Sequence, residues 1–111
     1  MADNVGTDLP VTVHRIMTDQ ILATKWAIPL LRILVRGPAR FTHLKSELPE
    51  LSANILSARL RLFQEVGLVQ HIELPPPASC HVYELTERAD GVRPILDAID
   101  AWTLMTLDRA D

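Results

Sequence analysis

The sequence predicts a mainly helical α+β domain in which amphipathic helices surround one short β-hairpin. Its 111 residues fit a single domain, because domains usually contain about 100–150 residues. Apolar residues recur at spacings of three and four in several segments, the period of a helix buried on one side. Three consecutive prolines at 75–77 separate two strand-like segments and predict the hairpin loop. Hydrophobic residues make up 48% and charged residues 23%, so oligomerisation is expected to cover exposed apolar surface.

The first part of the chain is expected to contain an arm and two helices. Residues 1–11 are expected to form a flexible N-terminal arm before one domain over residues 12–111. An apolar stripe predicts a helix over residues 11–23, which begins at the last residue of this arm. A second helix over residues 26–35 is apolar nearly all round, so we expect it at the centre of the core. Pro29 is tolerated in its first turn.

The next two helices have the spacing of a helix-turn-helix. After a Gly-Pro pair, a short helix is predicted over residues 42–48, with Thr42 as its N-cap. Ser52 is then expected to cap a longer helix over residues 53–65, which Gly67 ends. A short helix, a tight turn and a second capped helix form the helix-turn-helix motif.

The last part of the chain is expected to contain a hairpin and a terminal helix. Strands are predicted over residues 68–74 and 80–85, and Thr86 is expected to cap a final helix with one long apolar face. Together with the preceding motif, this order predicts a winged helix-turn-helix with a two-stranded wing. His71 and His81 could face each other across the wing, but two ligands are too few for a tetrahedral metal site.

The distribution of charge bears on whether nucleic acid is a partner. The net charge of −3 alone argues against it, because DNA-binding domains are usually basic. The deficit lies at the ends: residues 1–31 carry −1 and residues 89–111 carry −3, while residues 32–88 carry seven basic and six acidic residues. Charges farther apart than about 8 Å are largely screened at physiological salt. The chain can therefore present a modest basic face, although an ordinary fluctuation of surface charge is the alternative.

The helix predicted over residues 53–65 carries the candidate base-reading residues. Its inward face is expected to comprise Ile55, Leu56, Leu60 and Phe63. The opposite face would then present Asn54, Ser57, Ala58 and Arg61. Asn matches the paired hydrogen-bonding groups of adenine and Arg those of guanine, while Ser is adaptable and Ala permits close approach. Because the second helix of such a motif enters the major groove, this face is predicted to read bases; a solvated polar face is the alternative.

Residues around the motif are candidates for phosphate contacts, which position a protein on DNA without reading its sequence. They are Arg36, Arg40, Thr42, His43, Lys45, Ser52 and Arg59. Thr42 and Ser52 are helix caps first, and the free N–H groups at a helix start also suit a phosphate. Arg59 lies toward the inward edge of its helix, so pairing with an acid inside the fold is an equal alternative. Each of the other charged residues is alternatively a solvated surface charge.

An ordered set of segments resembles the HxlR-type transcriptional regulators over roughly residues 12–103. The segments are KW at 25–26, LLRIL at 30–34, GPARFTHL at 37–44, LSARLRLF at 56–63, GLV at 67–69, YELTE at 83–87, RPIL at 93–96 and Trp102. The resemblance implies a prokaryotic winged-helix protein without catalysis that dimerises through its terminal helices and binds operator DNA. Two features depart from the family. No cysteine occurs at residues 12–15, so its cysteine switch is not carried over, and the wing lacks arginine.

The combined prediction is a transcriptional regulator that binds a near-palindromic double-stranded DNA operator as a homodimer. The expected dimer interface comprises Ile16, Ile95, Ile99 and Trp102. A protein-interaction module, or a small-ligand sensor with little or no DNA binding, is the alternative. No catalytic constellation is apparent, so no enzyme, cofactor or metal is expected, while a small-molecule effector is a candidate partner. The single cysteine, Cys80, and the absence of an apolar run of about 20 residues indicate a reducing cytoplasm and no membrane span.

Overall fold

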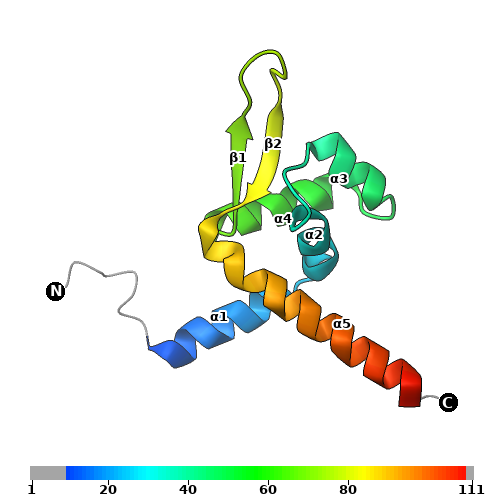
Figure 1. Cartoon of the computed structure of the whole chain (residues 1–111). Helices are drawn as coiled ribbons and strands as arrows, with labels where there is room; N and C mark the ends of the chain where they lie inside the picture. Colours follow the sequence, from blue (N-terminus) through cyan, green and yellow to red (C-terminus); the bar gives the residue numbers. More distant parts are fainter. Residues whose placement is uncertain (1–9, 110–111) are drawn as a thin grey trace.

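The structure is a computed structural model that describes residues 10–109, except for the side chains of His14, Asp108 and Arg109. The elements in order are α1 (Val11–Ala23), α2 (Ala27–Leu34), α3 (Phe41–Glu47), α4 (Ala53–Glu65), β1 (Val69–Glu73), β2 (His81–Leu85), the 3₁₀ turn η2 (Glu87–Gly91) and α5 (Val92–Arg109). The wing of β1 and β2 projects from one end, and α1 and α5 lie at the other (Figure 1). The predicted mainly helical winged helix-turn-helix is confirmed. Residues 1–9 of the expected arm lie outside the described residues.

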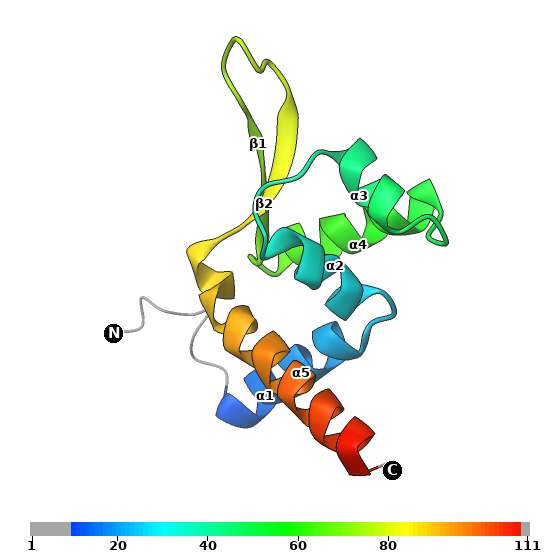
Figure 2. The same cartoon turned by 45° about the vertical axis from the view of Figure 1, so that its right-hand side comes forward.

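The helix α2 lies at the centre of the hydrophobic core, as its all-round apolar sequence predicts. Its buried residues are Ala27, Leu30, Leu31, Ile33 and Leu34. Around it pack Leu44 of α3 and Leu56, Leu60 and Phe63 of α4. Burial of one large apolar side chain contributes about 1.5–3 kcal/mol, so this cluster supplies much of the attraction between the helices. Figure 2 shows α2 between the α3–α4 pair and the two terminal helices.

The start of α3 differs from the sequence-based expectation. The helix begins at Phe41, so Arg40 occupies the N-cap position without a side-chain cap, and the expected N-cap role of Thr42 is wrong. The cause is a short antiparallel bridge in which the N–H groups of Ala39 and Tyr83 donate to each other's carbonyls at 2.9 and 2.8 Å. This bridge holds the chain extended through Arg40, so the helix starts immediately afterwards.

The two ends of α4 agree with the sequence, but one of its side chains does not. Ser52 caps the helix, because its Oγ accepts a hydrogen bond from the Ile55 backbone N–H at 3.2 Å. At the other end Gly67 has a φ of 83°, and the Leu68 N–H donates to the Phe63 carbonyl at 2.8 Å. The inward position expected for Ile55 is wrong, since this side chain is 41% exposed. It precedes the buried stripe by one residue, which is about 100° around the helix.

The register of the wing corrects the expected histidine pair. His71 lies opposite Tyr83, and His81 lies opposite Glu73, so the two histidines are diagonal neighbours and not direct partners. Their ring centroids are 5.2 Å apart, whereas His71 stacks on Tyr83 at 4.2 Å with nearly parallel rings. Direct pairing of the two histidines would require a loop centred at Pro76. The loop is centred at Pro77, and moving the centre by one residue shifts the pairing by two residues.

The last segment begins with η2 before α5 starts at Val92. Thr86 occupies the N-cap position of η2, but its Oγ1 donates a hydrogen bond to the Gly67 carbonyl at 2.6 Å. The expected capping role of Thr86 is therefore wrong, because its hydroxyl ties the end of β2 to the end of α4. Val92 and Leu96 are buried, whereas the C-terminal half of α5 extends beyond the core (Figure 1). No helix within residues 10–109 is long and apolar enough to cross a bilayer.

Candidate nucleic-acid interface

The outer face of α4 presents the four residues expected to read bases. Asn54, Ser57, Ala58 and Arg61 are all exposed, on the side opposite the buried stripe of this helix. Their spacings of three and four place them in one row along the helix. The first turn of α4 contains no acidic residue, so no carboxylate of this turn repels an approaching phosphate. A short turn connects α4 to α3 (Figure 2). Base reading by these four residues stays a prediction.

The basic candidates around α3 differ in how far they are already engaged. Glu47 contacts two of them, with Oε1 at 3.3 Å from Arg36 Nη2 and Oε2 at 3.4 Å from His43 Nε2. Lys45 is half-buried, and its Nζ donates to the Pro49 carbonyl at 3.4 Å. Arg40 and Thr42 are exposed. A phosphate at this surface therefore has to compete with Glu47 for two of its expected partners, a competition that the sequence pattern did not reveal.

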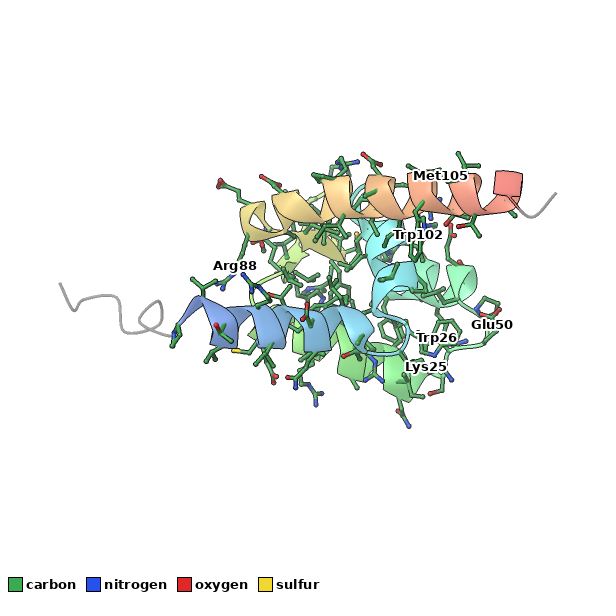
Figure 3. The ribbon with its side chains drawn as sticks, turned by 90° about the horizontal axis from the view of Figure 1, so that it is seen from below. Lys25, Trp26, Glu50, Arg88, Trp102 and Met105 are labelled. Atoms are coloured by element: carbon green, nitrogen blue, oxygen red, sulfur yellow. The ribbon has the colours of Figure 1, made fainter. Side chains whose placement is uncertain are left out.

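The Arg59 side chain bonds to a backbone carbonyl of its own chain and not to an acidic side chain. Its Nε donates a hydrogen bond to the Lys25 carbonyl at 2.8 Å, and the side chain is half-buried. Lys25 lies in the turn between α1 and α2, where Trp26 has a left-handed φ of 75° (Figure 3). The Arg59 side chain therefore links the candidate reading helix to the start of the central helix. A phosphate contact by its remaining nitrogens stays a prediction.

The wing offers hydrogen-bonding rings but no Lys or Arg side chain. The strands β1 and β2 contain no Lys or Arg, and each contains one glutamate, Glu73 and Glu84. Gln70 Nε2 donates to Glu84 Oε1 at 2.9 Å, which occupies part of one face. Among the side chains that the structure describes, no three of His, Cys, Asp or Glu are grouped closely enough to hold a metal ion. His71 and His81 therefore do not form a metal site with a third ligand among these side chains.

Exposed apolar side chains gather on α1 and α5, the expected dimerisation helices. Ile16, Ile95 and Trp102 are 51%, 40% and 70% exposed, whereas Ile99 is half-buried against the core of its own chain. Further exposed apolar residues that the prediction did not include are Val11, Val13, Met17, Leu104, Met105 and Leu107. Figure 3 shows both helices at the end of the domain seen from below, with Trp102 and Met105 on α5. A place in a dimer interface stays a prediction for all of them.

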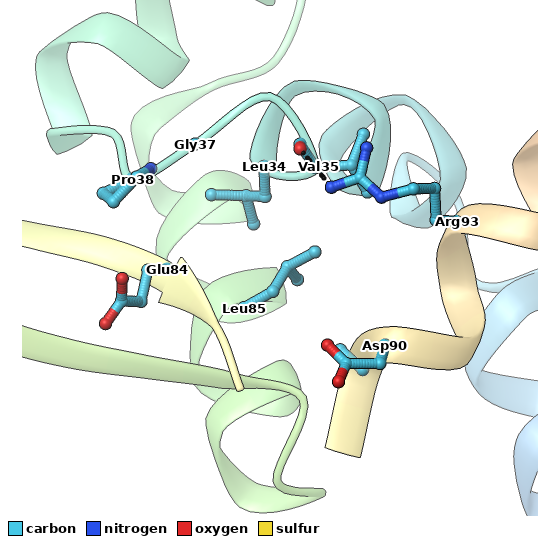
Figure 4. A pocket seen from close by; sticks show the side chains of 9 residues that line it. Leu34, Val35, Gly37, Pro38, Glu84, Leu85, Asp90 and Arg93 are labelled. Carbon is cyan, nitrogen blue, oxygen red and sulfur yellow. Dashed lines mark hydrogen bonds between the residues drawn. The ribbon is translucent and has the colours of Figure 1, made fainter. Parts of the chain in front are cut away.

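Two arginines that the sequence did not single out attach α5 to α2. Arg32 Nη1 lies 2.8 Å from Asp100 Oδ1. Arg93 Nη2 donates to the Val35 carbonyl at 2.8 Å, at the C-terminal end of α2 where a cation is favoured (Figure 4). Arg93 also borders a cavity of about 400 Å³ that Asp90 lines as well. The terminal helix α5 is thus connected by two side-chain contacts to the helix that supports the reading surface.

The relatives found by comparison with known proteins are helix-turn-helix proteins. A family model for the HxlR-like helix-turn-helix matches residues 21–111. The uncharacterized HTH-type transcriptional regulator YvaP of Bacillus subtilis is 31% identical over 88 residues, which cover 79% of this chain and 82% of YvaP. The HTH-type transcriptional regulator YodB of the same organism is 26% identical over 82 residues, or 74% of this chain and 73% of YodB.

Solved structures share the fold. The crystal structure of the HTH-type transcriptional regulator YtcD matches with a TM-score of 0.75 at 26% identity, covering 83% of this chain and 94% of YtcD. The reduced form of YodB matches with a TM-score of 0.71 at 24% identity, covering 78% of this chain and 84% of YodB, and a quinone-bound form of YodB also matches. Because the family model spans most of the sequence, this chain belongs to the HxlR family of helix-turn-helix transcriptional regulators.

Proposed function

We propose that this regulator binds DNA sequence-specifically as a homodimer on a near-palindromic operator in a prokaryotic cytoplasm. The observation that carries the proposal is the outer face of α4. It combines an exposed row of small and hydrogen-bonding side chains with a buried opposite stripe and a Ser52-capped N-terminus. In a helix-turn-helix the N-terminal part of the second helix contacts base edges in the major groove.

The proposed contacts divide into base reading and positioning. Asn54 is suited to adenine and Arg61 to guanine, while Ser57 adapts and Ala58 lets the helix approach the groove floor. Arg40 and Lys45 on the neighbouring surface are proposed to contact phosphates, with Arg36 and His43 joining when Glu47 releases them. Such contacts fix the position of the protein on the duplex and make affinity fall with salt.

The dimer is proposed to form through α1 and α5. Their exposed apolar side chains would be covered by a second copy, which removes a large unfavourable contact with water. Two copies of α4 would then enter successive major grooves about 34–36 Å apart. The quinone-bound form of the relative YodB supports a small-molecule effector as a further partner.

The experiment that tests this function is selection of preferred duplexes from random DNA, followed by fluorescence anisotropy with the selected sequence. Two inverted half-sites about 10 base pairs apart centre to centre are expected. Affinity is expected to fall steeply with salt, because bound phosphates release counterions. If the protein shows no preference over random duplex at low salt, the proposed function is wrong.

A protein-interaction module without DNA binding is the second candidate. Two observations favour it: Glu47 engages Arg36 and His43, and the wing strands contain glutamate but no Lys or Arg. This candidate predicts that the wild-type protein stays unbound to duplex DNA even at low salt. The anisotropy titration therefore separates the two functions directly.

A further inference from the structure

A second cavity lies away from the candidate DNA-binding face, where α1, the end of α4 and the start of α5 meet. Its volume is about 520 Å³, within the range of about 300–1,000 Å³ that is usual for small-molecule sites. Its apolar walls include Met17, Ile21, Leu22, Leu68, Val92 and Ile95, and Ile95 also belongs to the proposed dimer interface, which the cleft therefore borders. This cleft is therefore large and apolar enough to take the body of a small amphipathic molecule.

Arg88 of η2 supplies a cation to this apolar cleft. It lines the cavity, is exposed, and forms no ion pair or side-chain hydrogen bond with the residues that the structure describes. Figure 3 shows the Arg88 side chain between α1 and the start of α5. A Cβ at Gly67 would lie 3.3 Å from Arg88 Cδ, so the arginine passes closely over the glycine that ends α4. An arginine in this position can bind a carboxylate through two parallel hydrogen bonds.

One acidic residue, Glu65, also lines the cleft, without an ion pair to Arg88. Its negative charge in the lining disfavours a ligand with two negative groups, because like charges repel. The cleft thus combines an apolar wall, one available cation and one limiting anion. These features together fit a monoanion attached to an apolar chain or ring.

We propose that this cleft binds a small amphipathic carboxylate, with its apolar body against α1 and α5 and its carboxylate on Arg88. The ligand would touch both terminal helices and the Gly67 turn that ends α4. Binding there would favour one orientation of α4 relative to the terminal helices, and an effector acts only through such differential binding. This regulatory consequence rests on the proposed DNA-binding function, whereas ligand binding itself does not.

The test is an NMR titration of the ¹⁵N-labelled full chain with decanoate below its micelle concentration, without DNA. Saturable shifts are expected for the Gly67 and Gly91 amides, because both residues line the cleft. Decyltrimethylammonium has the same apolar chain with the opposite charge and is expected to bind at least about tenfold more weakly. Arg88→Gln is expected to weaken decanoate binding by about tenfold or more, the usual effect of losing a charged hydrogen bond. The matched variant Glu65→Gln is expected to bind decanoate as well as or better than the wild type.

Several results would overturn the assignment. They are absence of saturable shifts, equal binding of the two amphiphiles, and unchanged decanoate affinity in Arg88→Gln with a wild-type circular dichroism spectrum. Absence of shifts would also follow if a second copy of the chain filled the cleft, which excludes the ligand equally. A separate anisotropy titration with and without decanoate tests the effect on DNA affinity. Failure of DNA binding alone would refute the proposed function and leave the ligand site standing.

Discussion

Arg59 and Arg61 lie two residues apart on α4, and replacing each with alanine is expected to damage a different property. A hydrogen bond to a charged group contributes about 1.5–3 kcal/mol, and the half-buried Arg59 is expected at the lower end, about 1.5 kcal/mol. Because 1 kcal/mol shifts the Tm of a domain of this size by about 4–8 °C, Arg59→Ala should lower Tm by about 6–12 °C. Arg61 is exposed, so Arg61→Ala should change stability by less than about 0.5 kcal/mol. The DNA affinity of the Arg61→Ala variant should fall by about 1–3 kcal/mol, which is about 5–150-fold.

The assay pairs thermal unfolding by circular dichroism with fluorescence anisotropy on the selected duplex. Protein concentration is held constant, because the Tm of a dimer depends on it. Arg59→Lys is the control: it keeps the charge but not the planar guanidinium, so it should lower Tm while retaining most of the DNA affinity. If Arg59→Ala left Tm unchanged and reduced DNA affinity tenfold, Arg59 would contact DNA and the reasoning from its Lys25 hydrogen bond would be wrong.

Three further changes test the surface, the core and the proposed dimer. Glu47→Gln should release Arg36 and His43, and should therefore raise DNA affinity several-fold and steepen its dependence on salt. Anisotropy at several salt concentrations measures both effects. Weaker binding by this variant would contradict the competition between Glu47 and phosphate. Phe63→Ala should cost about 3–5 kcal/mol in urea unfolding, since the ring is fully buried; a loss below about 1 kcal/mol would contradict its place in the core. Trp102→Asp should shift sedimentation toward monomer, and a stable dimer would refute the proposed interface.

Helix boundaries were predictable where a local signal acts alone. Ser52 and Gly67 define α4 through hydrogen bonds and backbone conformations that depend on adjacent residues, and both were correctly predicted. Thr42 and Thr86 carry the same kind of signal, but tertiary contacts override it. A bridge to the wing moves the start of α3, and the Gly67 carbonyl takes the Thr86 hydroxyl.

The candidate site was predictable as a face and not as a set of free side chains. The helical period placed Asn54 and Arg61 on the exposed side of α4 without knowledge of the fold. It did not show that Glu47 engages Arg36, because Arg36 lies in a different segment, whereas the contact of His43 with Glu47 lies within α3 at an i, i+4 spacing that the helical period could have revealed. The cleft beside Arg88 was also invisible, since its walls are far apart in the sequence.

The sequence by itself determined the family, the order of elements, the central position of α2 and the outer face of α4. The family follows from the resemblance of the ordered segments to known members, and the other properties follow from periodicity and caps, which are local. Only the tertiary structure decided the register of the wing and the partner of Arg59, and it alone joined α5 to α2 and formed the cleft at Arg88. Each of these depends on distances between residues remote in the chain, which are set when the apolar faces pack together.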